Sequence, residues 1–482
     1  MLPFPERAKD LAARTERNSA WRQRDCFNLI PSESTPSLLV KMCEIADPAG
    51  RYAEHRTMKG DEVYFYQGTD FIRDVELECQ KELAAYFGCA DIELRPVSGQ
   101  MANEVVFKGL VKFLNRGRAE GQASRRMRLV LNNELIYGGH LSAQPMGALF
   151  NYVEEDPATG KEQVVNFPVR KDNPYKPDLD RLAGILESRK PELIVFGKSM
   201  FLYREPVRFV ADIVSGWKER PVLMFDMAHV LGLYGAFQAP FEEGADIVTG
   251  STHKTFFGTQ RGVVAGNIPK SSPLRPLWPE IKGRAFPGST SNHHLGTLLG
   301  LLMASYEMNA FKEPFQKQVL ANAKALAQAL HAHGIPVEGD PADGYTETHQ
   351  VIIRVKAFGP GMEIARRLET NNVLTNYQAL PDDATFLESS GIRLGVQEMT
   401  RFGMQEKDFD TLAGLMADII IRNKPAGDDV ARYRKSFLTM GFTLPTAEAL
   451  PLAARILSTV LPDPSYAAAF AENLRRAAGA HK

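Results

Sequence analysis

The sequence predicts an α/β protein that has a large, mostly parallel sheet and a smaller α+β unit after it. Short apolar segments recur along the middle of the chain, and spacers of helical length separate them. This alternation is typical of βαβ units, in which parallel strands are buried on both faces. A chain of 482 residues is also too long for one simple core, so two or three structural units are expected.

The large unit is expected to span residues 51–310. Apolar positions recur at helical spacing from Asp70 to Phe87, which predicts a helix there. The segments that follow are short and rich in β-branched or aromatic residues, as buried strands are. The predicted strands are Arg128–Leu131, Leu193–Phe196, Val222–Phe225, Asp246–Val248 and Val263–Ala265. Residues 1–50 precede this unit as a polar N-terminal arm, which we expect to wrap a neighbouring subunit.

A smaller α+β domain is expected over residues 311–425. A long amphipathic helix from about Lys312 to His333 should lead into it. The predicted elements that follow are strands at Val351–Val355 and Gly391–Leu394 and helices at Ile364–Thr370 and Asp408–Arg422. Residues 424–429 have the composition of a linker. Residues 426–482 form an Ala-rich helical extension that carries no recognisable chemical motif.

Composition excludes several classes of function. The formal net charge is −1, from 57 basic and 58 acidic residues, and nothing in it suggests a nucleic-acid surface or a polybasic membrane contact. The four cysteines have neither metal-ligand spacing nor histidine partners, so no metal site is expected. The longest apolar run, residues 298–304, is far short of the roughly 20 residues that a membrane helix needs. The prediction is a soluble, cytoplasmic protein.

The strongest local motif is Ser251–Thr255, Ser-Thr-His-Lys-Thr, which directly follows a predicted strand. A lysine amine can form an imine with an aldehyde cofactor if its environment lowers its pKa. A hydroxyl-rich turn at a strand end suits that task, which makes Lys254 the candidate nucleophile. An isolated lysine is, however, more often an ordinary surface residue.

A second motif places Asp226 at the end of the strand Val222–Phe225. A carboxylate in that position can pair with the protonated pyridine nitrogen of a cofactor and so keep its ring an electron sink. The plainer interpretation is a helix N-cap, because aspartate is common at helix starts that follow strands.

Two further segments could contact a phosphorylated, planar cofactor. Val97–Asn103 opens an apolar helix with small residues, whose exposed backbone N–H groups favour phosphate. Tyr137–His140 brings an imidazole after two glycines, where it could stack on a flat ring. Each alone also describes an ordinary helix cap or a structural histidine.

Together, in this order and at these intervals, the motifs resemble the serine (glycine) hydroxymethyltransferase family of fold-type I pyridoxal-phosphate enzymes. The matching segments are NLIPSES, RYAEH, YFYQGTDFIRDVE, SGQMAN, GGH, DMAH, STHKT, FPGSTSNHH and SGIRLGVQEMTRFG. The resemblance covers roughly residues 20 to 425. It implies an aspartate-aminotransferase-like fold, pyridoxal 5′-phosphate as cofactor and tetrahydrofolate as the one-carbon co-substrate. It also implies a homodimer or higher homo-oligomer with shared active sites.

The resemblance assigns roles around the cofactor residue by residue. Lys254 would hold it as a Schiff base, Asp226 would contact the pyridine nitrogen, and His140 would stack on the ring. His229 would lie near the phenolic oxygen. The other expected cofactor contacts are Ser98, Gly99 and Gln100 of the phosphate loop together with Ser199, His253, Tyr52 and Gly288.

The resemblance also assigns the substrate side of the site. Arg393 would clamp the amino-acid carboxylate, since a guanidinium grips it bidentately and orients the α-carbon. Ser32 would lie near the same carboxylate. Glu54 would act as acid and base on the hydroxymethyl group. Tyr66, with Tyr52, would reach into the site of the neighbouring subunit.

Several positions depart from the family pattern, so the chain is a divergent member of the set it resembles. The phosphate loop reads Ser98–Met101 and lacks one hydroxyl, and Phe65 replaces the first of two tyrosines. Gln260 stands where bacterial members commonly have arginine, and Gln378 stands where an asparagine contacts folate. The changes at positions 65 and 378 bear on the one-carbon acceptor and leave the amino-acid chemistry intact.

Three functions remain open at this point. The first is transfer of the hydroxymethyl group of serine, or of an α-substituted serine such as α-methylserine, to tetrahydrofolate. The second is a folate-independent aldolase or transaldolase acting on threonine-like β-hydroxy-amino acids. The third is a catalytically idle family member with a binding or structural role. Retention of the lysine, aspartate, histidine, glutamate and arginine named above argues against the third.

Overall fold

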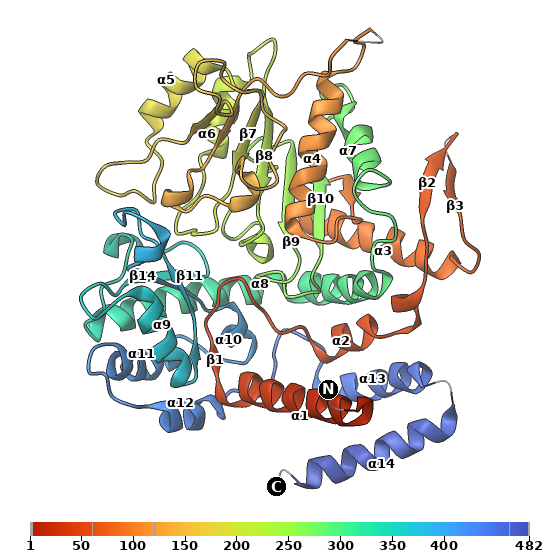
Figure 1. Cartoon of the computed structure of the whole chain (residues 1–482), viewed down its shortest axis with the longest axis vertical. Helices are drawn as coiled ribbons and strands as arrows, with labels where there is room; N and C mark the ends of the chain where they lie inside the picture. The colour runs from red at the N-terminus through yellow and green to blue at the C-terminus, as the bar shows by residue number, and fades with distance from the viewer. Residues whose placement is uncertain (1–2, 60, 120–121, 462, 481–482) are drawn as a thin grey trace.

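The computed structural model describes residues 3–59, 61–119, 122–461 and 463–480, and a seven-stranded sheet forms its centre (Figure 1). Its strands, in spatial order, are β4 (Asp91–Glu93), β10 (Gly262–Gly266), β9 (Ile247–Ser251), β8 (Val222–Asp226), β7 (Leu193–Phe196), β5 (Val130–Asn132) and β6 (Val164–Asn166). The pairs from β9 to β6 are parallel, and only β10 runs against its neighbours. The predicted mostly parallel sheet is confirmed.

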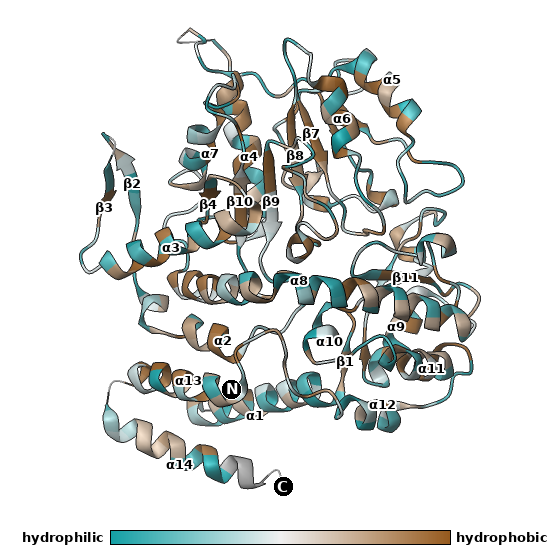
Figure 2. Cartoon of the chain, turned by 180° about the vertical axis from the view of Figure 1, so that it is seen from behind, coloured by the Kyte–Doolittle hydropathy of each residue, from teal (hydrophilic) through white to brown (hydrophobic). Residues whose placement is uncertain are grey.

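Both faces of this sheet are buried, as its continuous apolar strands require. In β7, Ile194 and Phe196 join one hydrophobic core while Leu193 and Val195 join another. The helices around the sheet are α3 (Asp70–Phe87), α4 (Gly99–Leu114), α5 (Leu179–Arg189), α6 (Val207–Val214) and α7 (Leu277–Ala285). Figure 2 shows the strands as strongly hydrophobic, whereas α5 and the outer side of α3 carry hydrophilic residues. The bounds of α3 match the prediction.

A single long helix, α8 (Leu295–Ala332), joins the two units and packs on both α3 and the small-unit helix α11 (Asp408–Ile420). The sequence predicted only its second half, from Lys312. In the first half Leu298, Leu301 and Ala304 are all fully buried. A segment surrounded by protein has no polar face, so the amphipathic pattern that reveals a helix is absent there.

The small unit contains a three-stranded antiparallel sheet in the order β11 (Gln350–Arg354), β14 (Gly391–Gly395) and β13 (Asn376–Gln378). Helix α9 (Gly361–Thr370) packs beside it, α11 packs on α9 and α8, and α10 (Gln397–Arg401) follows β14. The predicted strands and helices here are confirmed to within three residues. Strand β13 was missed because its residues are only half-buried.

The first and the last helices of the chain lie below the two units in the view of Figure 1. Helix α1 (Phe4–Ala20) leads to β1 (Phe27–Asn28), which pairs in parallel with β12 (Val373–Leu374) of the same chain. Helix α2 (Leu38–Glu44) precedes the antiparallel strands β2 (His55–Met58) and β3 (Asp61–Tyr64). The C-terminal helices are α12 (Gly427–Arg434), α13 (Thr446–Val460) and α14 (Pro464–Ala480). Helix α13 packs on α2, and α12 begins inside the segment predicted as a linker.

None of the helices in the described residues is long and apolar enough to cross a membrane.

Candidate active site

The carboxyl ends of the parallel strands bring the main candidate residues together. Strand β8 ends at Asp226, β9 ends at Ser251 three residues before Lys254, and Ser199 follows β7. His140 follows β5 in the chain and contacts Asp226. In an open α/β sheet ligands bind outside these strand ends. Residues separated by more than a hundred positions therefore meet at one edge of the sheet.

Lys254 is buried, and its amine makes no hydrogen bond to any described residue. Burial lowers its pKa to about 8; the nearby Arg393 acts in the same direction, and the carboxylate of Asp226 opposes them. An amine with that pKa is partly unprotonated near neutral pH, as a nucleophile must be. The environment therefore favours imine formation at this lysine.

Asp226 is 3% exposed and held by several donors. Its Oδ2 accepts hydrogen bonds from Asn103 Nδ2 at 2.7 Å and Ser142 Oγ at 3.1 Å, and its Oδ1 accepts from the Ala228 N–H at 2.9 Å. Nδ1 of His140 lies 3.4 Å from the same carboxylate. These contacts fix the carboxylate in the position where a ring nitrogen could be paired.

The start of α4 lies directly against the turn that precedes Lys254. Ser98 caps the helix by accepting from the Met101 N–H at 3.1 Å. A Cβ added to Gly99 would lie 2.2 Å from Oγ of Ser251, so only glycine allows this approach. Gln100 is exposed at the same end. The first N–H groups of a helix attract anions, which makes this end a phosphate-binding candidate.

Two further histidines, His229 and His253, are largely buried close to Lys254. Burial, with Lys254 and Arg393 nearby, holds the pKa of His229 well below its usual range, so its ring is neutral. Its ring centre lies 5.8 Å from that of His140. Burial also lowers the pKa of His253 to about 4, and its Nδ1 has no hydrogen-bond partner in the described structure.

Arg393 is a buried cation that has no counter-ion among the described residues. Only 8% of the residue is exposed, and burial lowers its pKa to about 10. Its guanidinium donates to the backbone oxygen of Ser199 and, at 3.3 Å, to Oδ1 of Asn376. Within the described residues no carboxylate lies in ion-pair range of it. An unpaired buried charge is costly, so this guanidinium is poised to bind an external carboxylate.

The turn that contains Ser32 lies beside the strand of Arg393. The Gly395 N–H donates to the Leu29 oxygen at 2.8 Å. Nε2 of His349 lies 3.1 Å from the Pro31 oxygen. The N-terminal segment therefore packs beside the strand that carries Arg393 in the same chain.

Four predicted residues lie outside this group. Tyr52 and Tyr66 are 52% and 41% exposed, and their rings are 5.3 Å apart. The Tyr66 hydroxyl is 3.5 Å from Oε2 of Glu54, and Gly288 is exposed. None of the four has a hydrogen bond, ion pair or ring contact with Lys254 or Asp226 of its own chain. In Figure 1 the adjoining β2–β3 hairpin stands away from the body of the molecule.

A buried network fixes the base of that hairpin. Glu76 of α3 accepts from the Tyr64 hydroxyl at 2.8 Å and lies 3.5 Å from Nδ1 of His55. Its other oxygen lies 2.9 Å from Nε2 of His293, whose Nδ1 is 3.0 Å from Arg261. The hairpin is therefore anchored to the strand that follows the lysine turn.

Sequence reasoning missed Asn103, Ser142, Gln350 and Asn376 as site residues. Asn103 lies in the helix-start motif, and Ser142 lies two residues after His140. Gln350 and Asn376 contact His229 and Arg393 from other segments, and no local pattern identifies them. The four residues form hydrogen bonds with Asp226, His229 or Arg393.

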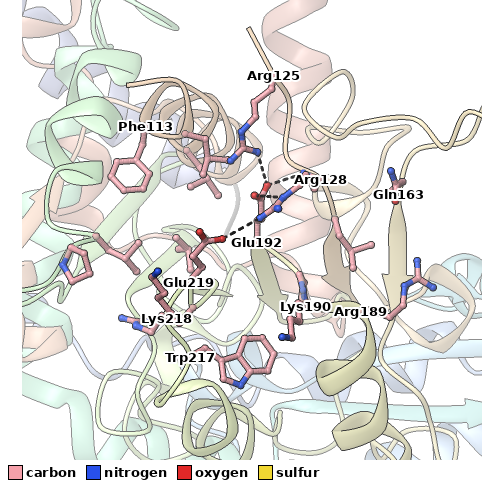
Figure 3. A pocket seen from close by; sticks show the side chains of 18 of the residues that line it. Phe113, Arg125, Arg128, Gln163, Arg189, Lys190, Glu192, Trp217, Lys218 and Glu219 are labelled. Atoms are coloured by element: carbon pink, nitrogen blue, oxygen red, sulfur yellow. Dashed lines mark hydrogen bonds and ion pairs between the residues drawn. The ribbon is translucent and has the colours of Figure 1, made fainter. Parts of the chain in front are cut away.

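A cavity of about 1040 Å³ lies at the opposite edge of the sheet, before the start of β5, β7 and β8 (Figure 3). Glu192 sits in it and accepts from Arg125 at 3.0 Å and from Arg128 at 2.7 Å. Trp217 forms another part of the wall. None of the predicted site residues lines this cavity, so it is separate from the candidate active site.

Comparison with known proteins decides the family. The family model described as serine hydroxymethyltransferase matches residues 6–416. The chain belongs to the serine hydroxymethyltransferase family. A serine hydroxymethyltransferase of Pyrobaculum arsenaticum is 36% identical over 426 residues, covering 88% of this chain and 91% of that protein. One from Sulfolobus acidocaldarius is 33% identical, covering 96% and 100%.

A solved structure shows the same fold. The crystal structure of L-threonine transaldolase from Pseudomonas fluorescens in an internal aldimine state superposes with a TM-score of 0.77. It covers 94% of this chain and 97% of its own, at 24% sequence identity. The fold is therefore the fold-type I arrangement predicted from the sequence.

Serine hydroxymethyltransferases depend on pyridoxal 5′-phosphate, and the residues gathered here fit that cofactor. The amine of Lys254 is buried and has a lowered pKa, as an imine-forming lysine needs. The carboxylate of Asp226 is fixed by three hydrogen bonds. Gly99 lets the start of α4, whose first backbone N–H groups favour a phosphate, lie directly against Ser251 near the lysine. The chain is accordingly a pyridoxal-phosphate-dependent transferase.

Proposed function

We propose that this enzyme transfers the hydroxymethyl group of serine, or of an α-substituted serine such as α-methylserine, to tetrahydrofolate. The observation that carries this proposal is Arg393, a buried guanidinium that no carboxylate of the described chain pairs with. It lies close enough to Lys254 to help lower the pKa of that amine. An amino acid would supply the missing carboxylate there. The family membership supports the reaction type.

The proposed chemistry divides among a few side chains. Arg393 would hold the substrate carboxylate and so orient the bonds at the α-carbon, which decides the bond that breaks. The cofactor, when bound, supplies a sink for the electron pair left on that carbon. Asp226 would keep the ring nitrogen protonated. Glu54 of a neighbouring subunit would take the proton from the hydroxyl of the substrate.

A folate-independent aldolase or transaldolase remains a second candidate. Gln378 stands where the family has an asparagine that contacts folate, and its amide donates to the adjacent Ala379 oxygen at 3.4 Å. Phe65, 49% exposed, replaces a tyrosine. Both substitutions are at positions that bear on folate. The residues expected to bind the amino acid are all retained.

Product analysis with serine, α-methylserine and threonine, each with and without tetrahydrofolate, separates these candidates. We expect rapid conversion of serine or α-methylserine only when tetrahydrofolate is present. Rapid cleavage of threonine, independent of folate, would instead establish the aldolase class. Lack of turnover of all three by protein loaded with the cofactor would favour an idle role.

The Arg393→Lys variant should bind serine more weakly while it keeps its affinity for the cofactor. A planar guanidinium makes two parallel hydrogen bonds to a carboxylate, whereas an ammonium is a point charge, so about 1.5–3 kcal/mol should be lost. Spectral titration measures both affinities. Arg354→Lys on the adjacent strand β11 is the matched control, because Arg354 pairs with Glu338 and Asp382. Unchanged serine affinity in Arg393→Lys would mean that another residue holds the carboxylate.

A further inference from the structure

Gln350, the first residue of β11, is completely buried and its amide is held at both ends by backbone groups. Its Oε1 accepts from the Phe201 N–H at 3.0 Å, and its Nε2 donates to the Ser199 oxygen at 3.1 Å. If the amide were flipped, its NH₂ group would face the Phe201 N–H and its oxygen would face the Ser199 oxygen. Neither pair could form a hydrogen bond. The orientation of this side chain is therefore fixed by its surroundings.

The fixed NH₂ group has a second hydrogen, which faces His229. The distance from Nε2 of Gln350 to Nδ1 of His229 is 3.4 Å, and both groups are buried. An amide NH₂ can only donate, so Nδ1 must be the acceptor and carries no proton. Because the ring is neutral, its single proton lies on Nε2.

The charges around His229 act in the same direction. Burial disfavours a positive imidazole most, and the nearby Lys254 and Arg393 disfavour it further. The His229 ring therefore carries only one proton. If that proton were on Nδ1, Nε2 would have none to donate. In this site, which nitrogen carries the proton is decided by the hydrogen bond at the other nitrogen.

We propose that Gln350 is a positioning residue that holds His229 in the Nε2–H tautomer, so that this ring presents a donor to the phenolic oxygen of the cofactor. The inference rests on the proposed place of His229 beside that oxygen. A donor there stabilises negative charge on the oxygen, whereas the other tautomer would direct a lone pair at it. Gln350 would thus act on the cofactor through His229 without touching it.

Nitrogen NMR of the holoenzyme labelled with ¹⁵N-histidine tests the tautomer directly. The chain has ten histidines, and a difference spectrum with His229→Asn identifies the signals of His229. We expect the wild-type ring to show a protonated Nε2 and an unprotonated Nδ1. The opposite pattern in the wild-type holoenzyme would overturn the proposal, whatever substrate the enzyme uses.

Two variants test whether Gln350 is the cause. In Gln350→Glu the carboxylate can accept but not donate, so the proton should move to Nδ1 or the ring should become charged. In Gln350→Met the donor is lost without a new acceptor, so the two nitrogen signals should move toward each other. An unchanged His229 spectrum in either folded variant would mean that Gln350 does not set the tautomer.

Gln238 provides a matched control because its amide is clamped in the same way. Its Oε1 accepts from the Glu205 N–H at 3.1 Å and its Nε2 donates to the Glu205 oxygen at 2.7 Å, but its second hydrogen goes to Glu243. Gln238→Met should therefore leave the His229 spectrum unchanged. A similar shift in this control would mark the effect as general loosening and overturn the specific role.

Kinetics separates this inference from the proposed function. Gln350→Met should lower kcat by about tenfold or more, because a histidine that is no longer held in the right tautomer is a poor partner. The serine KM should change by less than about twofold, since methionine adds no charge beside Arg393, which shares the Ser199 oxygen with Gln350. If serine is not the substrate, the NMR result stands and the same kcat loss should appear with the true substrate. A raised KM with unchanged kcat would contradict the role.

Discussion

Replacement of Lys254 by alanine should abolish covalent binding of pyridoxal 5′-phosphate and lower turnover by at least about a thousandfold. The purified wild-type protein should be yellow, and the variant should lack the absorption band of the lysine–cofactor imine. Borohydride reduction followed by peptide mapping should locate the label on Lys254 in the wild type and find no labelled lysine in the variant.

The physical reason is that no other described lysine has a comparable environment. Lys198 is the second buried lysine in the described chain, and it also follows a strand of the central sheet. Its Nζ, however, lies 3.5 Å from the buried carboxylate of Glu205 and so already has an ion-pair partner. Lys254 instead makes no hydrogen bond to the part of the chain that the structure describes, and burial lowers its pKa.

Lys198→Met is therefore the control for this prediction, and it should retain the yellow colour. A labelled Lys198 peptide in the Lys254→Ala variant would show that the cofactor can use another amine. If the Lys254→Ala protein kept an imine band of normal strength, the assignment of the nucleophile would be wrong.

The sequence could predict those residues of the candidate site that lie in short motifs at the ends of strands. Asp226 and Lys254 each follow a strand directly, and parallel strands bring their carboxyl ends together. Family resemblance then supplied the roles. The predicted strands agree with the structure because their burial on both faces makes them continuously apolar.

The residues that contact the candidate catalytic groups could not be predicted in the same way. Gln350 contacts a histidine 121 positions away, and Asn103 contacts an aspartate 123 positions away. Such pairs depend on the packing of the small unit and of α4 against the sheet, which no local periodicity encodes. The first half of α8 was missed for a related reason, because complete burial removes the polar face.

Mixing two inactive variants, Lys254→Ala and Glu54→Gln, should restore activity if the active site is shared between subunits. The motive is the position of Glu54: it lies beside exposed Tyr66 and makes no contact with Lys254 of its own chain. In a mixed dimer one of the two sites would contain an intact lysine from one subunit and an intact glutamate from the other. Random pairing in a two-fold dimer gives about a quarter of wild-type activity.

Arg393 supplies the matched control for this experiment, because it lies beside Ser199 and influences Lys254 within a single chain. A mixture of Lys254→Ala and Arg393→Ala subunits should stay inactive, since every site in it lacks either the lysine or the arginine. Subunit exchange must be demonstrated in both mixtures by co-purification of an untagged with a tagged subunit. The contrast between the two mixtures then reports which residues share a chain.

A shared site also requires a stable interface. An obligate dimer should bury more than about 2,000 Å² and cover much of the apolar surface around the hairpin, where Tyr52, Phe65 and Tyr66 are now exposed. If the Lys254→Ala and Glu54→Gln mixture remains as inactive as its parents after proven exchange, Glu54 works within its own chain. The exposed hairpin would then have to fold back over the site of its own subunit when substrate binds.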